Sequence, residues 1–308
     1  MRPRFAFRTG RRTLELGART LVMGVVNVTP DSFSDGGLYF APEAAVEHAL
    51  RLLDQGADIV DVGGESTRPG AQTQPTSTTE ARRHGENVRT FVSQEEELRR
   101  VLPVIGELKR RRPEAIVSID TYKSTVARAA LQAGAEMVND VSGLRWDPQM
   151  AATIAALGCG AVLMHTRGRP EQWRSLPLVD DMVALVSREL GESAEMALRA
   201  GVGHDRLVLD PGFGFGKNYE ENHPLLARFE EFHRLGFPLM AGVSRKSFVG
   251  KLMARGRPLP APEERLSGSL AAAAVCILKG AHIIRAHDVK PTVEAAAVAD
   301  AAVKAAAD

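Results

Sequence analysis

The sequence has few of the features that mark secreted, membrane or nucleic-acid-binding proteins. Only two of its 308 residues are cysteines, Cys159 and Cys276, and neither shows metal-ligand spacing, which favours buried reduced thiols over a disulfide. The 39 Lys and Arg residues nearly balance the 38 Asp and Glu residues, so the formal charge of +1 indicates neither a nucleic-acid binder nor a membrane-surface binder. We therefore expect a cytoplasmic protein in which any anion site is local.

Long apolar runs and common metal motifs are also absent. Residues 1–9 include no apolar core of signal-peptide length, and the small apolar run at 270–278 is far too short to span a bilayer. No His-Glu-x-x-His motif occurs, and the Gly-Cys-Gly at 158–160 has no adjacent base that would favour a nucleophile. The sequence thus predicts a soluble protein without a zinc centre.

A short apolar run followed by a helical segment recurs along the chain. Each run has the length and composition of a strand buried on both faces. The expected strands are residues 22–28, 59–63, 116–120, 137–141, 161–165, 207–210, 239–243 and 283–288. Helical spacing occurs at 42–55, 94–110, 123–133, 180–200, 263–279 and 291–307.

Eight such units predict an α/β fold, a closed (β/α)8 TIM barrel that forms one domain over residues 1–308. We expect an N-terminal β-hairpin within residues 4–20, with its turn at Thr9 and Gly10. A doubly wound open sheet is the structural alternative, because periodicity alone cannot show that the sheet closes.

Polar side chains stand at the ends of the expected strands. In a barrel these ends converge on the face where active sites of this fold are built. Each polar residue could instead cap a helix or satisfy a turn, but the whole set favours a site. Its members are Asn27, Asp61, Asp120, Asn139, His165, Asp210, residues 244–247, Arg285 and His287.

The segment Asp-Pro-Gly-Phe-Gly-Phe-Gly-Lys at 210–217 matches neither a P-loop nor the dinucleotide glycine pattern. Its alternating glycines favour backbone that approaches a flat ligand closely. Asp210 could accept two parallel hydrogen bonds from an aminopyrimidine edge, and Asp120 and Asn139 could meet other polar atoms of a bicyclic heterocycle. For Asp120, a helix cap remains the alternative.

Cations follow the expected second, seventh and eighth strands. They include Arg68, the Ser-Arg-Lys-Ser run at 244–247, and Arg285. Barrels of this kind often hold phosphate after strands seven and eight, so an anion site is favoured over a solvated charged surface. The amide oxygen of Asn27 would suit a Mg²⁺ ion that shares a diphosphate, although residues 27–35 could also form an ordinary turn.

Together these stretches resemble the dihydropteroate synthase family. The most specific matches are Gly-Val-Val-Asn-Val-Thr-Pro-Asp-Ser-Phe-Ser-Asp-Gly-Gly at 24–37 and Asp-Val-Gly-Gly-Glu-Ser-Thr-Arg-Pro-Gly at 61–70. Further matches follow in family order at 118–121, 138–140, 210–217, 244–247 and 267–289, so the resemblance spans almost the whole chain. The family joins a dihydropterin diphosphate to p-aminobenzoate, with Mg²⁺, and releases pyrophosphate.

The resemblance also implies roles for individual residues. The pterin would be held by Asp120, Asn139, Asp210, Lys246 and Arg285. The diphosphate would be held by Asn27, Arg68, Arg285 and His287, with Asn27 also a ligand of Mg²⁺. The p-aminobenzoate site would comprise Thr67, Pro69, Phe215 and Ser247. The residues closest to catalysis would be Phe33, Asp35, Arg68 and Lys246.

Two further expectations and two alternatives accompany the resemblance. It implies a homodimer, and it shows that residues 72–91 form a polar, Thr-rich insertion where the family passes quickly to the next helix. A pterin-binding methyltransferase on the same barrel is one alternative, although the motifs at 27–35 and 66–70 argue against it. A noncatalytic pterin-binding paralogue is the other.

Overall fold

The computed structural model describes residues 2–29, 42–65 and 92–306 of the chain. Parallel strands pair in the order β8-β7-β6-β5-β4-β3-β10-β9. The Leu209 amide donates to the Pro238 carbonyl at 2.9 Å, and Leu209 forms a parallel bridge with Leu239, so β8 meets the start of β9 and the sheet closes. The predicted barrel is confirmed, and the open-sheet alternative is wrong. The strands are β3 (Leu21–Asn27), β4 (Ile59–Gly63), β5 (Ile116–Asp120), β6 (Met137–Asp140), β7 (Gly160–Met164), β8 (Leu207–Asp210), β9 (Met240–Ala241) and β10 (Ile283–Ala286).

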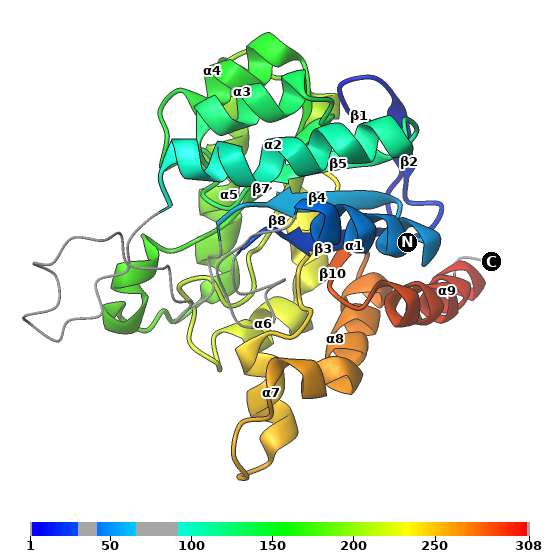
Figure 1. Cartoon of the computed structure of the whole chain (residues 1–308). Helices are drawn as coiled ribbons and strands as arrows, with labels where there is room; N and C mark the ends of the chain where they lie inside the picture. Colours follow the sequence, from blue (N-terminus) through cyan, green and yellow to red (C-terminus); the bar gives the residue numbers. More distant parts are fainter. Residues whose placement is uncertain (1, 30–41, 66–91, 307–308) are drawn as a thin grey trace, which may run out of the picture.

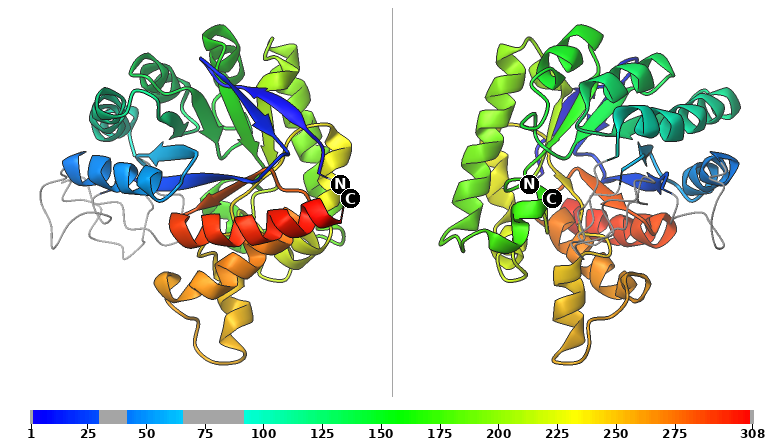
Figure 2. Two further views of the ribbon diagram at one scale, coloured as in Figure 1. Left: turned by 90° about the vertical axis from the view of Figure 1, so that its right-hand side faces the viewer. Right: turned by 60° about the vertical axis from the view of Figure 1, so that its left-hand side comes forward.

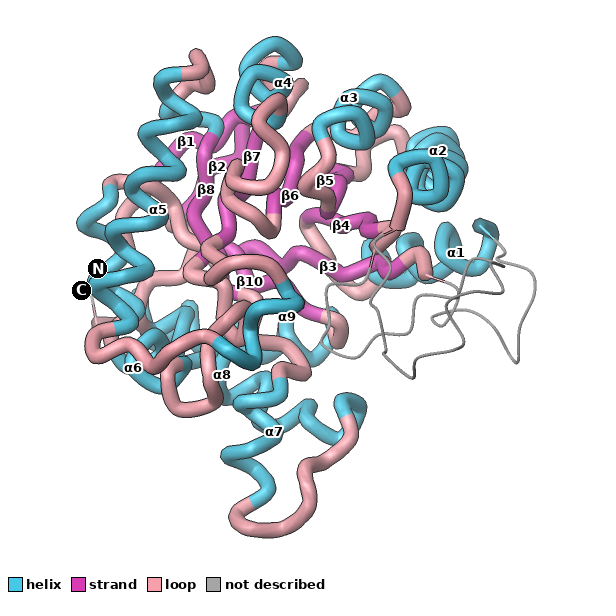
Figure 3. Tube along the Cα trace, turned by 90° about the vertical axis from the view of Figure 1, so that its left-hand side faces the viewer, coloured by secondary structure: helices cyan, strands magenta, loops and turns pink. Residues whose placement is uncertain are grey.

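Helices surround the strands, as Figures 1 and 3 show for α1 to α5. The α-helices are α1 (Pro42–Asp54), α2 (Gln94–Arg111), α3 (Ser124–Gln132), α4 (Met150–Leu157), α5 (Met182–Arg199), α6 (Asn222–Ala227), α7 (Ser247–Ala254), α8 (Leu266–Leu278) and α9 (Val289–Ala305). Short 3-10 helices are η3 (Pro170–Ser175), η4 (His204–Arg206), η5 (Phe229–Leu235) and η6 (Pro262–Arg265). Helices α4, α6 and α7 lie outside the segments in which helical spacing occurs, because each has eight residues or fewer and offers little periodicity to detect.

Strand alternation separates the core into two parts. Successive strand residues point alternately toward the helices and into the barrel. Residues of the second kind form an apolar cluster to which every strand of the barrel contributes and β3 also adds Leu21. Its central layer is distinct from the larger core beneath the helices. The members of this apolar layer are Met23, Ile59, Ile116, Met137, Val162, Val208, Met240 and Ile283.

The N-terminal hairpin closes one end of the barrel. Strands β1 (Phe5–Arg8) and β2 (Thr13–Leu16) pair antiparallel, as expected, although the turn extends over residues 9–12. The buried Phe7 and Leu16 pack against the apolar layer inside the barrel. Gly160 makes room for the Phe7 ring, because a Cβ atom at Gly160 would lie 2.7 Å from Phe7 Cζ. The hairpin therefore covers the end of the barrel opposite the carboxyl ends of the strands.

The N-terminal segment lies near α9, the red helix, in Figure 2. Arg2 donates to Asp300 of α9 at 2.6 Å and to the Ala281 carbonyl at 2.8 Å, which fixes the N-terminal segment beside β10. Helix α7 and the loop after it project from the barrel at the bottom of Figure 1. Among the described residues, no helix has the length and apolar character needed to cross a membrane. The insertion expected at 72–91 lies outside those residues, so the division into one domain with an insert stays a prediction.

Candidate active site

A polar layer lies above the apolar layer at the carboxyl ends of the strands. Because the period of a strand is two, each residue two or four positions after an apolar interior residue also points inward. Asp61 follows Ile59 in this way, and Ser118 and Asp120 follow Ile116. The same rule places four other side chains in the barrel mouth: Asn27, Asn139, Asp210 and Arg285.

Arg285 of β10 connects two carboxylates from neighbouring strands. Its Nε donates to Asp61 Oδ2 at 2.7 Å, and one terminal nitrogen donates to Asp120 Oδ2 at 2.6 Å. Burial opposes the charge on this guanidinium, but Asp61 and Asp120 outweigh burial and raise its pKa above the ordinary value. The guanidinium is therefore held in one orientation at the centre of the layer.

Several acceptors in this layer have no partner within the described protein. Asn139 Nδ2 donates to Asp61 Oδ2 at 2.8 Å, which leaves Asn139 Oδ1 and Asp61 Oδ1 buried and unpaired among the described residues. Buried polar atoms normally have hydrogen-bond partners, so unpaired acceptors indicate a ligand that supplies donors. Burial, reinforced by Asp61 and opposed by Arg285, raises the pKa of Asp120 to about 7.

Asp210 stands at the end of β8 and is held by the loop that follows it. Its Oδ1 accepts from the Gly212 amide at 2.7 Å, which fixes the carboxylate and leaves Oδ2 beside Gly242 of the next strand connection. Burial raises the pKa of this carboxyl, while the Gly212 amide and the charge of Lys246 oppose the rise. Asp210 therefore presents a fixed oxygen to the mouth of the barrel.

The glycine loop at 212–216 places an aromatic ring at the same mouth. Gly212, Gly214 and Gly216 all have positive φ, at 68°, 80° and 64°, conformations that other residues rarely adopt. Between them the Phe215 ring lies under the Lys246 ammonium, 3.9 Å from nitrogen to ring centroid, and meets the edge of Trp173 at 5.5 Å between centroids. The loop thus presents one flat apolar surface beside a cation.

The two cations of the Ser-Arg-Lys-Ser run, Arg245 and Lys246, have different surroundings. Arg245 adopts φ 58° and donates twice to Asp288, at 2.9 and 2.6 Å, so it fixes the loop instead of facing the mouth. Ser244 Oγ receives the His287 amide at 3.2 Å and lies 3.1 Å from His287 Nδ1. Besides Arg285, Lys246 and His287 are therefore the basic side chains that these two strand ends bring to the mouth.

Known proteins with similar sequences and structures complete this picture. The sequence model of the family described as pterin binding enzyme matches residues 23–87 and 82–287. The dihydropteroate synthase of Escherichia coli K12 is 45% identical over 284 residues, which is 92% of each chain. The chain belongs to the dihydropteroate synthase family. Two structures of the Xanthomonas albilineans synthase also match. The structure with 4-aminobenzoic acid is 45% identical, covers 98% of both chains and has a TM-score of 0.82. The structure with 7,8-dihydropteroate is 42% identical, covers 97% of this chain and 98% of the other, and has a TM-score of 0.79.

The barrel mouth brings together most of the described residues that the family resemblance selected. Asp120 and Asn139 are paired in register across β5 and β6, and Arg285 contacts Asp120 directly. Lys246 lies over Phe215, and Ser247 begins α7 immediately after it. Asn27 ends β3, the strand that pairs with β10 and its Arg285. Five selected residues lie outside the described part of the chain, namely Phe33, Asp35, Thr67, Arg68 and Pro69.

Asp61, like Ser118, belongs to the polar layer but was given no role by the resemblance. It is fully buried and binds both Asn139 and Arg285, so it sets the orientation of two groups assigned to the pterin. The sequence alone could have indicated this position. Asp61 lies two residues after Ile59 and so points into the barrel, whereas the other apolar residues of the strand face the helices.

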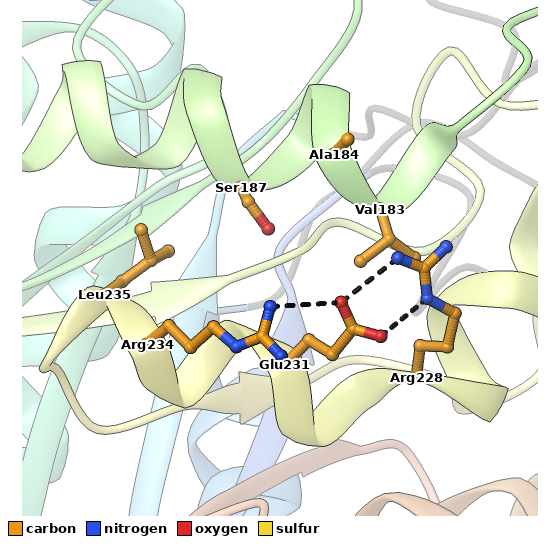
Figure 4. A pocket seen from close by; sticks show the side chains of 7 residues that line it. All are labelled: Val183, Ala184, Ser187, Arg228, Glu231, Arg234 and Leu235. Carbon is orange, nitrogen blue, oxygen red and sulfur yellow. Dashed lines mark hydrogen bonds and ion pairs between the residues drawn. The ribbon is translucent and has the colours of Figure 1, made fainter.

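A separate surface pocket of about 250 Å³ lies between α5 and η5, on the outer layer of helices. Figure 4 shows Arg228 and Arg234 both directed at Glu231, at 2.7 and 3.8 Å. These charges are already paired with each other, and the other lining residues are Ser187 and apolar residues. The candidate active site of this dihydropteroate synthase family member is therefore the barrel mouth.

Proposed function

We propose that the protein catalyses the condensation of 6-hydroxymethyl-7,8-dihydropterin diphosphate with p-aminobenzoate, giving 7,8-dihydropteroate and pyrophosphate. In this reaction a carbon–nitrogen bond forms at the pterin methylene, the carbon–oxygen bond to the diphosphate breaks, and the amine loses a proton. The observation that carries the proposal is the layer of fixed and unpaired acceptors from Asp120, Asn139 and Asp210 beside the cations Arg285 and Lys246.

The acceptors would bind the pterin ring at the bottom of the mouth. A carboxylate such as Asp210 can accept two parallel hydrogen bonds from the aminopyrimidine edge. Asn139 Oδ1 and the Asp120 carboxylate would receive other ring donors, since Asn139 Oδ1 has no partner among the described residues. Asp61 would act indirectly, by holding Asn139 and Arg285 in place.

Cations and a metal ion would hold the diphosphate. Arg285, His287 and the sequence-assigned Arg68 would share its negative charge and stabilise the charge that develops as it leaves. Mg²⁺ fits the donor chemistry of Asn27, because an amide oxygen is a hard ligand and water and diphosphate oxygens can complete the coordination. When bound, the ion would neutralise charge on the leaving group.

The second substrate would occupy the outer part of the mouth. Phe215 would pack against its aromatic ring, and Ser247 at the start of α7 would bind its carboxylate, together with the sequence-assigned Thr67 and Pro69. An arylamine is largely neutral at pH 7, so the attack requires no strong general base. The Xanthomonas albilineans relative bound to 4-aminobenzoic acid supports p-aminobenzoate as the second substrate.

Product analysis tests the proposal. Incubating the purified protein with the dihydropterin diphosphate, p-aminobenzoate and Mg²⁺ is expected to yield dihydropteroate and pyrophosphate in equal amounts, measured by mass spectrometry and a pyrophosphate assay. A noncatalytic paralogue would bind the pterin without forming either product. A methyltransferase would leave both substrates unchanged and would consume a methylated folate instead.

We also propose that the protein is a cytoplasmic homodimer. The neighbouring helices α8 and α9 carry exposed apolar side chains, among them Val275, Leu278 and Val298, and Val298 is 74% exposed. Such side chains on adjacent helices suit a subunit interface. The thiols of Cys159 and Cys276 are free and buried, which supports a reducing compartment.

A further inference from the structure

Lys217 ends the glycine loop and turns back into it. The side chain is buried, and its ammonium donates to the Gly212 carbonyl at 2.8 Å and the Phe215 carbonyl at 3.2 Å. The same nitrogen lies 2.9 Å from His165 Nδ1 and 3.4 Å from the His165 carbonyl. One ammonium therefore joins two points of the loop to the residue that follows β7.

His165 continues the connection to the outer layer of helices. Its side chain is 1% exposed, and Nε2 lies 3.2 Å from the Glu189 carboxylate of α5, which also receives Arg145 at 2.6 Å. Burial lowers the pKa of Lys217 to about 7, and the charge of Asp210 opposes this shift. In its charged form the Lys217 side chain can only donate, so His165 Nδ1 accepts and the ring proton lies on Nε2, facing Glu189. Burial, with a smaller effect of the Lys217 charge, lowers the pKa of His165 to about 3, in agreement with a neutral ring.

The loop has few other bonds that could fix it. Beyond those of Lys217, the described hydrogen bonds of its backbone are the Gly212 amide with Asp210, the Gly214 amide with Asn222 at 2.7 Å, and the turn bond from Phe215 to Gly212 at 3.2 Å. The Arg167 guanidinium also donates to the Gly216 carbonyl, at 3.2 Å. The three glycines with positive φ allow the loop many conformations when it is not held, so ordering it costs conformational entropy. The Lys217 ammonium binds the Gly212 carbonyl before the ring and the carbonyl of Phe215 itself, so the position of the Phe215 ring depends on it.

We infer that Lys217 and His165 are a positioning pair that sets the Phe215 surface of the arylamine subsite. This inference rests on the proposed function. The pair would not touch p-aminobenzoate, but it would influence the apparent affinity for that substrate through the position of Phe215. Glu189 fixes the tautomer, His165 supplies the acceptor, and Lys217 holds the loop. Asp210, which begins the same loop, keeps its own bond to Gly212 and so is affected less.

Two substitutions of His165 test its role as the acceptor of Lys217 separately from the other contacts of the imidazole ring. The amide of His165→Asn can place an oxygen near the Nδ1 position and still accept from Lys217, whereas the amide of His165→Gln reaches the Nε2 position and leaves Lys217 without that acceptor. We expect His165→Gln and Lys217→Met to raise the KM for p-aminobenzoate by about tenfold, and His165→Asn to change it by less than about twofold. The KM for the dihydropterin diphosphate should stay within about threefold in all three.

A spectroscopic readout reports on the loop directly. The chain has two tryptophans, and Trp173 is the one that meets Phe215, so a Trp146→Phe background isolates its emission. His165→Gln should shift the Trp173 emission maximum and His165→Asn should not. This comparison holds even if Lys217→Met fails to fold.

Equal KM values for p-aminobenzoate in the Asn and Gln variants would overturn the inference. So would parallel losses for both substrates, which would mean that the pair only supports the fold. If the unaltered protein forms no dihydropteroate, the proposed function fails and the inference fails with it. Turnover in the unaltered protein with no difference among the variants would refute the positioning pair alone.

Discussion

At the scale of single residues, the site depends on carboxylates held away from water. Asp61, Asp120 and Asp210 are brought to one end of the barrel, and each is fixed by a donor from a distant part of the chain or from its own loop. Leaving such acceptors buried costs free energy, and a donor-rich ligand would recover it on binding. Their exchange for amides is therefore the sharpest test of individual roles.

Asp210→Asn is expected to weaken pterin binding with little effect on stability. The amide oxygen can keep the bond from Gly212, but its NH₂ group would face the donors of the ligand. The expected loss is on the order of 1 to 3 kcal/mol of binding free energy, measured by calorimetry with a pterin analogue. Asp205→Asn, in η4 outside the site, is the matched control, and unchanged affinity in Asp210→Asn would remove Asp210 from the site.

Asp120 should make pterin binding depend on pH. Burial raises its pKa to about 7, so the free carboxyl gains a proton as the pH falls from 8 to 6. Protonation removes its charge and turns one acceptor oxygen into a donor that faces the donors of the ligand. Affinity should fall by about tenfold per pH unit below that pKa. Asp120→Asn has no carboxyl to titrate and should show a flatter profile over this range. Parallel profiles for the two proteins would contradict the assignment.

At the scale of elements, the hairpin and the strands divide the barrel into a stabilising end and a reactive end. Phe7 and Leu16 close the end opposite the polar layer and contact only the apolar interior among the buried clusters. Changes at this end should act on stability, and changes at the other end on binding.

Phe7→Ala is expected to lower the free energy of unfolding by about 3 to 4 kcal/mol, because it leaves a cavity among fully buried side chains. The KM values for both substrates should remain close to those of the unaltered protein at temperatures where it stays folded. Urea unfolding gives the first quantity and steady-state kinetics the second. Glu15 is exposed on the same hairpin, so Glu15→Ala is the control and should change neither stability nor KM. A large rise in either KM of Phe7→Ala would show that the two ends of the barrel are coupled.

Much of this arrangement could be predicted from the strands. Their residue parity places Asp120, Asn139 and Asp210 in the mouth, because each follows an apolar interior residue by an even number of positions. Closure was predicted from the count of eight units. The periodicity of the strands alone could not show it, since closure depends on the short β9 and a single bridge from Leu239 to Leu209. The choice of Asp61 and Asp120 as partners of Arg285 was also hidden, because 224 and 165 residues separate them in sequence.

At the scale of the whole molecule, we expect the outer surfaces of α8 and α9 to form the subunit interface of the proposed dimer. If the exposed Leu278 and Val298 lie in the proposed dimer interface, Leu278→Glu combined with Val298→Glu should convert the protein to a monomer in sedimentation velocity. The exposed Leu178, placed on the loop before α5, gives a matched control as Leu178→Glu. A dimer that survives the double substitution would locate the interface elsewhere.

The account as a whole requires that the barrel mouth both binds the pterin and forms the carbon–nitrogen bond. The most direct measurement follows pyrophosphate and dihydropteroate together in the unaltered protein and in Asp210→Asn, at saturating p-aminobenzoate and Mg²⁺. We expect one pyrophosphate for each dihydropteroate in the unaltered protein, and a fall in kcat/KM for the pterin substrate of about tenfold or more in Asp210→Asn, with an unchanged melting temperature. Equal kcat/KM values in the two proteins, or pyrophosphate released without dihydropteroate, would contradict it.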